Sequence, residues 1–489
     1  MKSELRTPEW QAVWIAVCAV GIITIIRVWL LIITPLQLYP DEAQYWWWAQ
    51  HPALGYFSKP PLIAWCIWLA THVFGRSVWA IRLASPLLHA GTALLVYAIA
   101  KLLGGRRLAL WSTLAYATLP GVAYSSGLMT TDVPLLFFWA MALYALLRAL
   151  EERGWRWTAI CGAAIGLGIL AKYAMLFFAV GLLLAATMSV KIRKFVFGRR
   201  GLLAAAIGII LISPNAYWNW HHHFLTFGHT AADADWRAAS FSVSNMLYFM
   251  AGQFGVFGPL LMAGFLIGLW RLWTSDQRSE TELLLAVMAL PPLLAMLVQS
   301  FISVANANWA APTYISATPL AVMVLMETPW ALLGSLVVDV AAMLLLWLVL
   351  IWPGVAGALG QANAFKREEG WRQLGQTITA EVRSHRYNVI AAANRSLLAE
   401  LTYYAPSRRV PLRAWEKNGV VANSFDMTMP LSRHDSHVLL VLLPQEVGAV
   451  LPSFESVRLV RKLQIHVGGG ITRTVMLFEA RSFKISPRP

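Results

Sequence analysis

Long apolar runs recur along this sequence from near its start to about residue 352. The runs extend for roughly 16 to 27 residues, and a helix needs about 20 mostly apolar residues to cross the hydrocarbon layer of a bilayer. Charged residues make up only 13% of the chain, whereas soluble domains contain about a quarter. The pattern therefore predicts a polytopic α-helical membrane protein.

The apolar runs predict about eleven membrane spans, near residues 12–34, 78–100, 108–128, 130–149, 157–171, 174–190, 201–216, 245–271, 283–304, 310–326 and 330–352. The run over residues 61–74 is too short to cross upright, so we expect a helix that lies along the membrane surface. The first run follows Lys2 and Arg6 and has no small-residue cleavage site. We therefore expect an uncleaved membrane helix there rather than a signal peptide.

The net charge of +15 is concentrated in short connections between apolar runs. The basic residues gather at positions 101–107, 148–156, 191–200 and 271–278. Short connections rich in lysine and arginine stay in the cytoplasm. We therefore expect a cytoplasmic N-terminus and a long external loop over residues 35–77. This distribution favours anionic lipids as partners and argues against nucleic acid.

The composition changes near Pro353, where mixed polar and apolar sequence replaces the long apolar runs. Strand-like and helical patterns follow at Val438–Leu443, Thr474–Phe478, Trp371–Val382 and Asn388–Tyr404. They predict a soluble α/β domain, which an odd number of spans places outside the cytoplasm. The expected organisation is a membrane domain over residues 1–352 and an external domain over residues 353–489.

An acidic pair, Asp41 and Glu42, follows the first apolar run in a part of the chain where acids are scarce. A charged side chain in or beside lipid is costly and therefore indicates a functional site. A solvated interfacial loop, where acids are harmless, is the alternative. The aromatic run Tyr45–Trp48 comes next, and Tyr and Trp concentrate at membrane interfaces. We expect this run to anchor the carboxylates at head-group depth.

Two cations of the external side are candidate phosphate ligands. Lys59 precedes Pro60 and Pro61, which stiffen the backbone, and Arg82 lies at the external end of the second expected span. An arginine offers a forked donor for phosphate. The alternative for Lys59 is that its ammonium only reaches out to lipid head groups.

A second candidate acid, Asp132, lies in an external turn between two expected spans. Thr131 and Asp132 before a helix, with Pro134 in its first turn, can be a simple N-cap. The sharper hypothesis is an acid that faces Asp41. Asp339 falls inside the last span, where we expect it to be paired with another helix, and it receives no role.

Three consecutive histidines, His221 to His223, occupy the expected external loop 217–244. Adjacent residues cannot all face one ion, and the spacing typical of a zinc protease motif is absent. A hydrogen-bonding, aromatic-lined sugar or phosphate pocket is therefore favoured over a divalent metal site.

Together these residues resemble the GT-C glycosyltransferases of the protein O-mannosyltransferase and aminoarabinose transferase superfamily, over about residues 1–350. The resemblance rests on the Asp-Glu pair after the first span, Tyr56-Phe57-Ser58-Lys59-Pro60-Pro61, Arg82-Leu83-Ala84-Ser85-Pro86, Thr131-Asp132 and Ala171-Lys172-Tyr173. The sequence looks most like bacterial family-39-like enzymes, with which it shares Tyr217-Trp218-Asn219, His223-Phe224, Thr226-Phe227 and Asn308-Trp309.

The resemblance implies a GT-C fold and an enzyme that uses a polyprenyl-phosphate sugar at the outer side of the membrane, with inversion at the anomeric carbon. Asp41 becomes the leading catalytic carboxylate with Glu42 beside it, Asp132 a second essential acid, and Lys59 a ligand to the donor phosphate. Further substrate-binding candidates are Arg82, Lys172, Tyr56, Tyr173, His223 and Asn308. Aminoarabinose transferases usually have Glu where this chain has Ser58, which puts their metal contacts and their sugar in doubt here.

The expected function is therefore an inverting glycosyltransferase of the bacterial inner membrane, monomeric and needing no cofactor. Its acceptor would be lipid A, the lipopolysaccharide core or another envelope glycan. The rival hypothesis is a transporter or flippase of lipid-linked sugars, which predicts inverted repeats and broken helices that meet at the midplane. The polar residues gather at one face instead. A third hypothesis, a membrane scaffold whose soluble domain acts, leaves the external acids and lysine unexplained.

Overall fold

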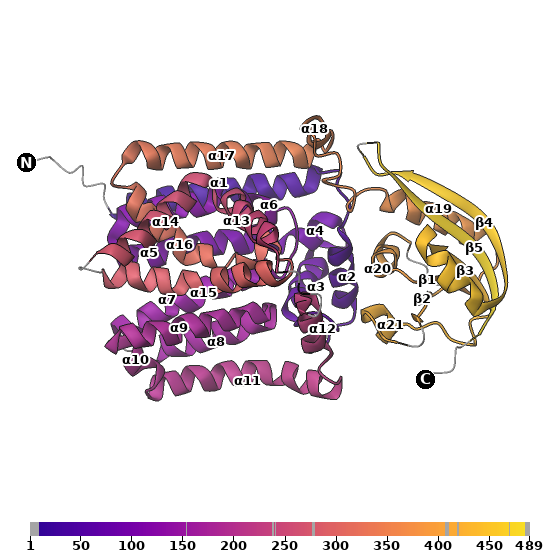
Figure 1. The fold of residues 1–489 in the computed structure, drawn as a ribbon, viewed down its shortest axis with the longest axis horizontal. Coiled ribbons are helices and arrows are strands. Elements are labelled where there is room, and N and C mark those ends of the chain that lie inside the picture. Colours follow the sequence, from indigo (N-terminus) through magenta and orange to yellow (C-terminus); the bar gives the residue numbers. More distant parts are fainter. Residues whose placement is uncertain are drawn as a thin grey trace, which may run out of the picture. The chain divides into compact units, whose positions relative to one another are not determined.

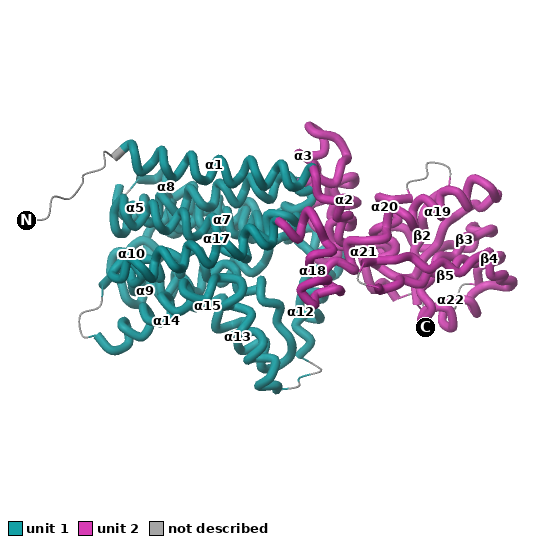
Figure 2. The backbone as a smooth tube through the Cα atoms, turned by 90° about the horizontal axis from the view of Figure 1, so that it is seen from above, with its two compact units in different colours: residues 1–32, 59–66, 82–347 teal, residues 33–58, 67–81, 348–489 magenta. Residues whose placement is uncertain are grey.

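The computed structural model describes residues 9–484 apart from 153, 237–238, 240, 276–278, 406–409, 418–419 and 469. Lys2, Arg6, Arg153 and Arg278, which contribute to the expected basic segments, lie outside the described residues. The chain divides into two compact units (Figure 2). Unit 1 comprises residues 1–32, 59–66 and 82–347, and unit 2 comprises residues 33–58, 67–81 and 348–489. Most of the long loop thus groups with the C-terminal residues.

The helices of both units are α1 (Glu9–Ile33), α2 (Pro40–Gln50), α3 (Leu62–Phe74), α4 (Val78–Arg82), α5 (Ala84–Thr118), α6 (Pro120–Ser125), α7 (Asp132–Glu152), α8 (Trp155–Ala171), α9 (Leu176–Met188), α10 (Val190–Val196), α11 (Arg199–His221), α12 (Leu225–Ala234), α13 (Val243–Phe257), α14 (Pro259–Thr274), α15 (Glu280–Ile302), α16 (Thr313–Leu325), α17 (Pro329–Ile351), α18 (Gly354–Ala358), α19 (Trp371–Ser384), α20 (Arg395–Tyr404), α21 (Ser424–Thr428) and α22 (Val447–Val450). Short 3₁₀ turns occupy Tyr173–Met175, Ala307–Ala310, Pro444–Glu446 and Leu451–Ser453.

Six helices among the described residues are long and apolar enough to cross a membrane, or seven if the bent pair α13 and α14 forms one span. The expected count of eleven is therefore not confirmed. One of the six, Val78–Thr118, carries non-helical backbone at Gly104 and Gly105, which breaks it near its middle. Residues 62–74 form the short helix α3 of 13 residues, less than the length needed to cross upright.

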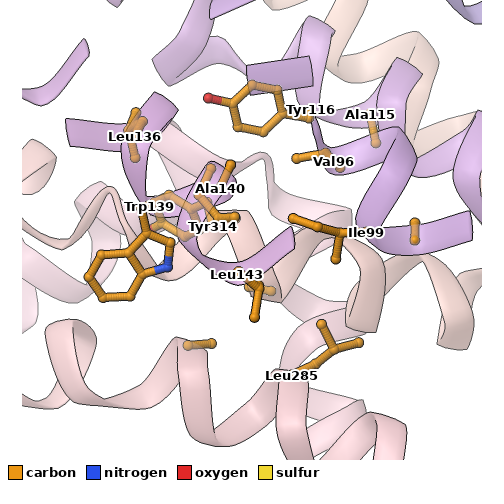
Figure 3. Close-up of a cluster of buried hydrophobic side chains, with 14 of the residues drawn as sticks. Val96, Ile99, Ala115, Tyr116, Leu136, Trp139, Ala140, Leu143, Leu285 and Tyr314 are labelled. Carbon is orange, nitrogen blue, oxygen red and sulfur yellow. The ribbon is translucent and has the colours of Figure 1, made fainter. Parts of the chain in front are cut away.

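Small residues bring the helices of unit 1 close together, and aromatic rings fill the space between them. A Cβ atom at Gly162 of α8 would lie 2.3 Å from the carbonyl oxygen of Ala204 on α11. Such close approach replaces the hydrophobic driving force that lipid cannot supply. In the core, Trp139 of α7 lies with Tyr116 and Tyr314 among aliphatic side chains (Figure 3). The long helices run side by side (Figure 1).

Unit 2 contains a five-stranded mixed sheet with the strand order β2-β1-β3-β5-β4. The strands are β1 (Val389–Ala392), β2 (Leu412–Ala414), β3 (His437–Leu442), β4 (Phe454–His466) and β5 (Thr472–Phe483). β1 pairs in parallel with β2 and β3, whereas β5 pairs antiparallel with β3 and β4. The strands expected over residues 438–443 and 474–478 are confirmed.

The single helix expected over residues 388–404 is wrong for its first part. Residues 389–392 form β1, which is buried throughout and lies between two parallel partners. A short apolar run of this kind fits a buried strand and a buried helix equally well, and here strand pairing decides. The helix α20 begins only after Asn394, whose side chain accepts hydrogen bonds from the backbone of Ser396 and Leu397.

Gly258 is the break between α13 and α14, whose axes differ by 110°. Its backbone has φ +85° and ψ 137°, a region open essentially to glycine alone. A Cβ atom there would lie 2.2 Å from Oδ1 of Asp339. Asp339 of α17 is fully buried, and neither of its oxygens has a hydrogen-bond partner among the described residues. Asp339 therefore packs against Gly258, and the polar partner expected for it on another helix is not found among the described residues.

We predict that Gly258→Ala lowers the free energy of unfolding by about 1–3 kcal/mol, because the added methyl group meets Asp339 and the backbone becomes strained. The matched control is Gly334→Ala on α17, where the new Cβ would meet its nearest neighbour at an ordinary 3.6 Å. Thermal unfolding of both variants in detergent measures the difference. Equal stability of the two variants would contradict this account of the bend.

Candidate functional site

The residues predicted to carry function belong to both units, and each unit is described by itself. Unit 2 contains Asp41, Glu42 and Tyr56. Unit 1 contains Lys59, Arg82, Asp132, Lys172, Tyr173, His223 and Asn308. Asp41, Asp132 and Lys59 each form a polar cluster with partners of their own unit.

Asp41 and Glu42 stand in the first turn of α2, which Pro40 begins. Proline suits the first helical position because no N–H is needed there, and acids suit the first turn because of the helix dipole. The Glu42 carboxylate accepts a hydrogen bond from the backbone N–H of Tyr39 at 3.0 Å and is only 1% exposed. Glu42 therefore caps the helix, and Asp41 is the partly exposed acid of the pair.

Asp41, Gln44 and Arg395 form the Asp41 cluster within unit 2. Arg395, the first residue of α20, donates from Nη2 to Oδ1 of Asp41 at 2.8 Å and from Nη1 to Oε1 of Gln44 at 2.7 Å. Asp41 and Gln44 are three residues apart on α2 and so share one helix face. Figure 1 shows α20 beside α2.

The aromatic run of α2 is buried in unit 2 except at Trp47, which is half-buried, so the expectation of a membrane anchor is wrong for Trp46 and Trp48. The Trp46 ring packs edge-on against Tyr403 of α20, with centroids 5.0 Å apart. The Trp48 indole N–H donates to Oγ of Ser424 at 2.8 Å. An indole ring needs an apolar partner and one acceptor. The C-terminal residues supply the ring contact for Trp46 and the acceptor for Trp48.

Tyr56 packs against Trp48 and holds the loop that follows α2. Its ring stacks on Trp48 at 4.5 Å, and its hydroxyl lies 3.0 Å and 3.2 Å from the carbonyl oxygens of Trp48 and His51. The same oxygen accepts the N–H of Ala53 at 3.1 Å. Burial raises the pKa of Tyr56 to about 12. The hydroxyl therefore serves the loop that follows α2.

Asp132, Lys172 and Asn308 form the Asp132 cluster within unit 1. Asp132 is the first residue of α7, and its side chain is 8% exposed. Nζ of Lys172 lies 2.6 Å from Oδ1, and Nδ2 of Asn308 donates to Oδ2 at 2.7 Å. Each carboxylate oxygen thus has its own donor. A buried charge is tolerated only with such complete pairing, so three separate turns of the chain are held together here.

Tyr173 follows Lys172 and ties the same turn to α11 and α12. Its hydroxyl donates to Oδ1 of Asn215 at 3.0 Å, and Nδ2 of Asn219 lies 3.3 Å from it. Its ring stacks on Phe227 at 4.8 Å, with the planes 5° apart. The two asparagines are buried and stand one turn apart on α11.

Lys59, Asp233 and His229 form the Lys59 cluster within unit 1. Nζ of Lys59 lies 3.6 Å from Oδ2 of Asp233, and Nδ1 of His229 lies 3.2 Å from the same oxygen. Partial burial alone would raise the pKa of Asp233. The hydrogen bond and charge of His229, with the charge of Lys59, outweigh burial and hold that pKa below its ordinary value. Lys59 keeps part of its side chain exposed.

The remaining predicted residues differ in exposure. Arg82 ends α4 and is buried. His223 is exposed on the turn between α11 and α12, where its backbone has φ +54°. His221 and His222 each turn a ring nitrogen toward the carbonyl oxygen four residues earlier. No three His, Cys, Asp or Glu side chains of the described residues are close enough together to hold a metal ion.

The sequence pointed to Lys59 and Asp41 but not to the side chains that pair with them. His229 and Asp233 are spaced one helical turn apart, a local signal that could have been used. Arg395 and Gln44 gave no local signal, because Arg395 is separated from Asp41 by 354 positions.

The chain is similar in sequence to several known glycosyltransferases. The family model for dolichyl-phosphate-mannose-protein mannosyltransferase matches residues 58–218. Lipid A galacturonosyltransferase RgtD of Rhizobium johnstonii is 30% identical over 470 residues, which cover 95% of this chain and 97% of that protein. The undecaprenyl phosphate-alpha-4-amino-4-deoxy-L-arabinose arabinosyl transferase of Pseudomonas aeruginosa is 30% identical over 220 residues, 38% of this chain and 40% of that protein.

The fold also has a solved counterpart. The crystal structure of ArnT from Cupriavidus metallidurans bound to undecaprenyl phosphate matches with a TM-score of 0.68, over 96% of this chain and 98% of that chain. The sequence identity is 16%, so this likeness concerns the fold alone. The match to the galacturonosyltransferase, together with the family model, confirms the resemblance to GT-C enzymes. Because the match to the galacturonosyltransferase runs along nearly the whole of both chains, this protein belongs to the GT-C superfamily of membrane glycosyltransferases that use polyprenyl-phosphate-linked sugars.

Proposed function

We propose that this glycosyltransferase moves a galacturonosyl residue from a polyprenyl-phosphate carrier to lipid A. The observation that carries the proposal is the likeness to a lipid A galacturonosyltransferase along nearly the full length of the chain. The lipopolysaccharide core or another envelope glycan is the alternative acceptor.

The proposed place of reaction is the periplasmic face of the bacterial inner membrane. The topology has eleven spans, a cytoplasmic N-terminus, a membrane domain over residues 1–352 and a periplasmic domain over residues 353–489. In this proposal the short apolar helices of residues 155–171, 173–188 and 313–325 cross the membrane as well as the long helices. The break at Gly104 and Gly105 divides Val78–Thr118 into two passes, and the bent pair α13 and α14 forms one span. The enzyme acts as a monomer in this proposal.

Asp41 is the proposed carboxylate at the sugar, and Glu42 fixes the helix turn that presents it. In the reaction the bond between the anomeric carbon and the phosphate oxygen breaks, and its electron pair leaves with the phosphate. A bond from the acceptor oxygen forms on the opposite face, with inversion. When the acceptor is a hydroxyl group, Asp41 takes its proton. When it is a phosphate, Asp41 acts by stabilising positive charge on the sugar and by positioning.

The departing polyprenyl phosphate needs positive charge beside it. Lys59 is the proposed ligand, because its side chain is partly exposed and its partner Asp233 lies at 3.6 Å, a loose distance for an ion pair. Arg82 is the second proposed phosphate ligand. The donor carries its own leaving group, so the scheme needs no cofactor.

The Asp132 cluster is proposed as the second essential part of the site. Lys172 and Asn308 hold the carboxylate from two sides, and Lys172 retains 22% exposure of its side chain. Tyr173 and His223 are proposed to contact the sugar or its phosphate from the same external turns.

We predict that Asp41→Asn lowers the rate of sugar transfer by about 10²–10⁴-fold, the usual contribution of a positioned acid–base group. Binding of the donor lipid should be retained. Transfer is measured by mass spectrometry of lipid A after incubation with enzyme in nanodiscs. Glu455→Gln, which changes an exposed acid of β4, is the control. Full activity of the Asp41 variant would remove this residue from the mechanism.

For Lys59→Ala we predict about tenfold weaker donor binding, equivalent to about 1.4 kcal/mol, because one charge opposite the phosphate is lost. Asp233→Asn is the matched variant, since it breaks the same ion pair but leaves the ammonium in place. Titration of both proteins with undecaprenyl phosphate distinguishes the two roles. If both variants lose affinity equally, Lys59 serves the ion pair and not the phosphate.

Lys172→Met should lower the free energy of unfolding by about 3 kcal/mol, because it leaves Asp132 as a buried charge without its cation. The double variant Asp132→Leu with Lys172→Met removes both charges and should regain most of this loss. Denaturant unfolding in detergent is measured for the wild type, Lys172→Met, Asp132→Leu and the double variant. A double variant no more stable than Lys172→Met would contradict the buried pairing.

A further inference from the structure

Arg395 is fixed in place at both ends of its side chain. Its backbone begins α20, which the Asn394 side chain caps. Its guanidinium donates to Asp41 and Gln44 on one face of α2. The proposed catalytic acid therefore has a permanent cation beside it, supplied by the C-terminal part of the chain.

The same guanidinium has donors to spare. Of the five N–H donors that an arginine offers, two make the bonds to Asp41 and Gln44. Among the residues that the structure describes, the other three have no protein acceptor. The Arg395 side chain is 36% exposed. Its charge and planar fork suit a second carboxylate.

A uronic acid sugar creates a particular electrostatic problem at Asp41. The sugar brings its own carboxylate toward a catalytic carboxylate, and like charges at close range repel strongly outside bulk water. A cation that contacts Asp41 and still has free donors removes this repulsion. A neutral sugar presents no such demand.

We infer that Arg395 is a specificity-determining residue, which binds the carboxylate of an acidic sugar on the donor lipid while it holds Asp41. The inference rests on the proposed transfer of a galacturonosyl residue. It assigns the C-terminal domain a place in substrate recognition, because α20 follows β1 of its sheet directly.

Arg367 provides a matched control in the same unit. Its guanidinium lies over the ring of Tyr39, 4.2 Å from the centroid, next to the start of α2. Removal of Arg367 therefore changes the local positive charge near α2 without removing a bond to Asp41.

The experiment compares two donors that differ only at the sixth carbon of the sugar: polyprenyl-phosphate galacturonate and polyprenyl-phosphate galactose. Binding of each is titrated on the full-length protein in nanodiscs, for the wild type, Arg395→Gln, Arg395→Lys and Arg367→Gln. We expect Arg395→Gln to bind the galacturonate donor at least tenfold more weakly and the galactose donor unchanged. Arg395→Lys should lie between, because it keeps the charge without the fork, and Arg367→Gln should match the wild type.

Each other outcome counts against the inference. Equal losses for both donors would make Arg395 a support for Asp41 only, and unchanged binding of both would remove it from recognition. The fold of each variant is checked by its melting temperature, and Arg395→Lys keeps the test valid if Arg395→Gln unfolds. A wild-type protein that does not prefer the galacturonate donor overturns the proposed function itself, and this inference with it.

Discussion

A carboxylate near lipid is tolerated when a donor from another part of the chain meets it, and this requirement shapes the site. Asp132 has a lysine on one oxygen and an amide on the other. Asp233 has His229 and Lys59, and Asp41 has Arg395. An unpaired charge costs several kcal/mol when water is excluded, so the buried Asp132 depends most on its partners. The side chains of Asp41 and Asp233 are 38% and 44% exposed, and their ion pairs contribute less. These acids therefore help to hold the fold together, in addition to their proposed part in the reaction.

The sequence predicted the elements that depend on local pattern. Apolar length marked the membrane helices, and scarcity of acids drew attention to Asp41 and Asp132. Pairings across the chain were beyond reach, because Asn308 is 176 positions from Asp132 and no periodicity connects them. The role of Glu42 was also missed. Pro-Asp-Glu reads as the start of a helix, which explains why one acid of the pair caps the backbone and the other is exposed.

The errors in the fold have a common cause, which is burial by distant segments. Residues 389–392 look helical alone but become a strand between two partners. The rings of Trp46 and Trp48 look like membrane anchors but are covered by Tyr403 and Ser424. Apolar and aromatic composition indicates that a surface is shielded from water. It does not indicate whether lipid or protein shields it.

Because residues 33–58 pack with residues 348–489, the order of synthesis affects how this unit can fold. Asp41 and Arg395 are 354 positions apart. Because ribosomes add about 5–20 residues each second, α2 waits roughly 20–70 s before α20 exists. Until then the covering side chains of Tyr403 and Ser424 are absent, and the membrane interface is the environment that suits exposed indole rings. The aromatic run thus suits the membrane interface while the chain is being made, and Trp46 and Trp48 become buried once α20 and α21 are present.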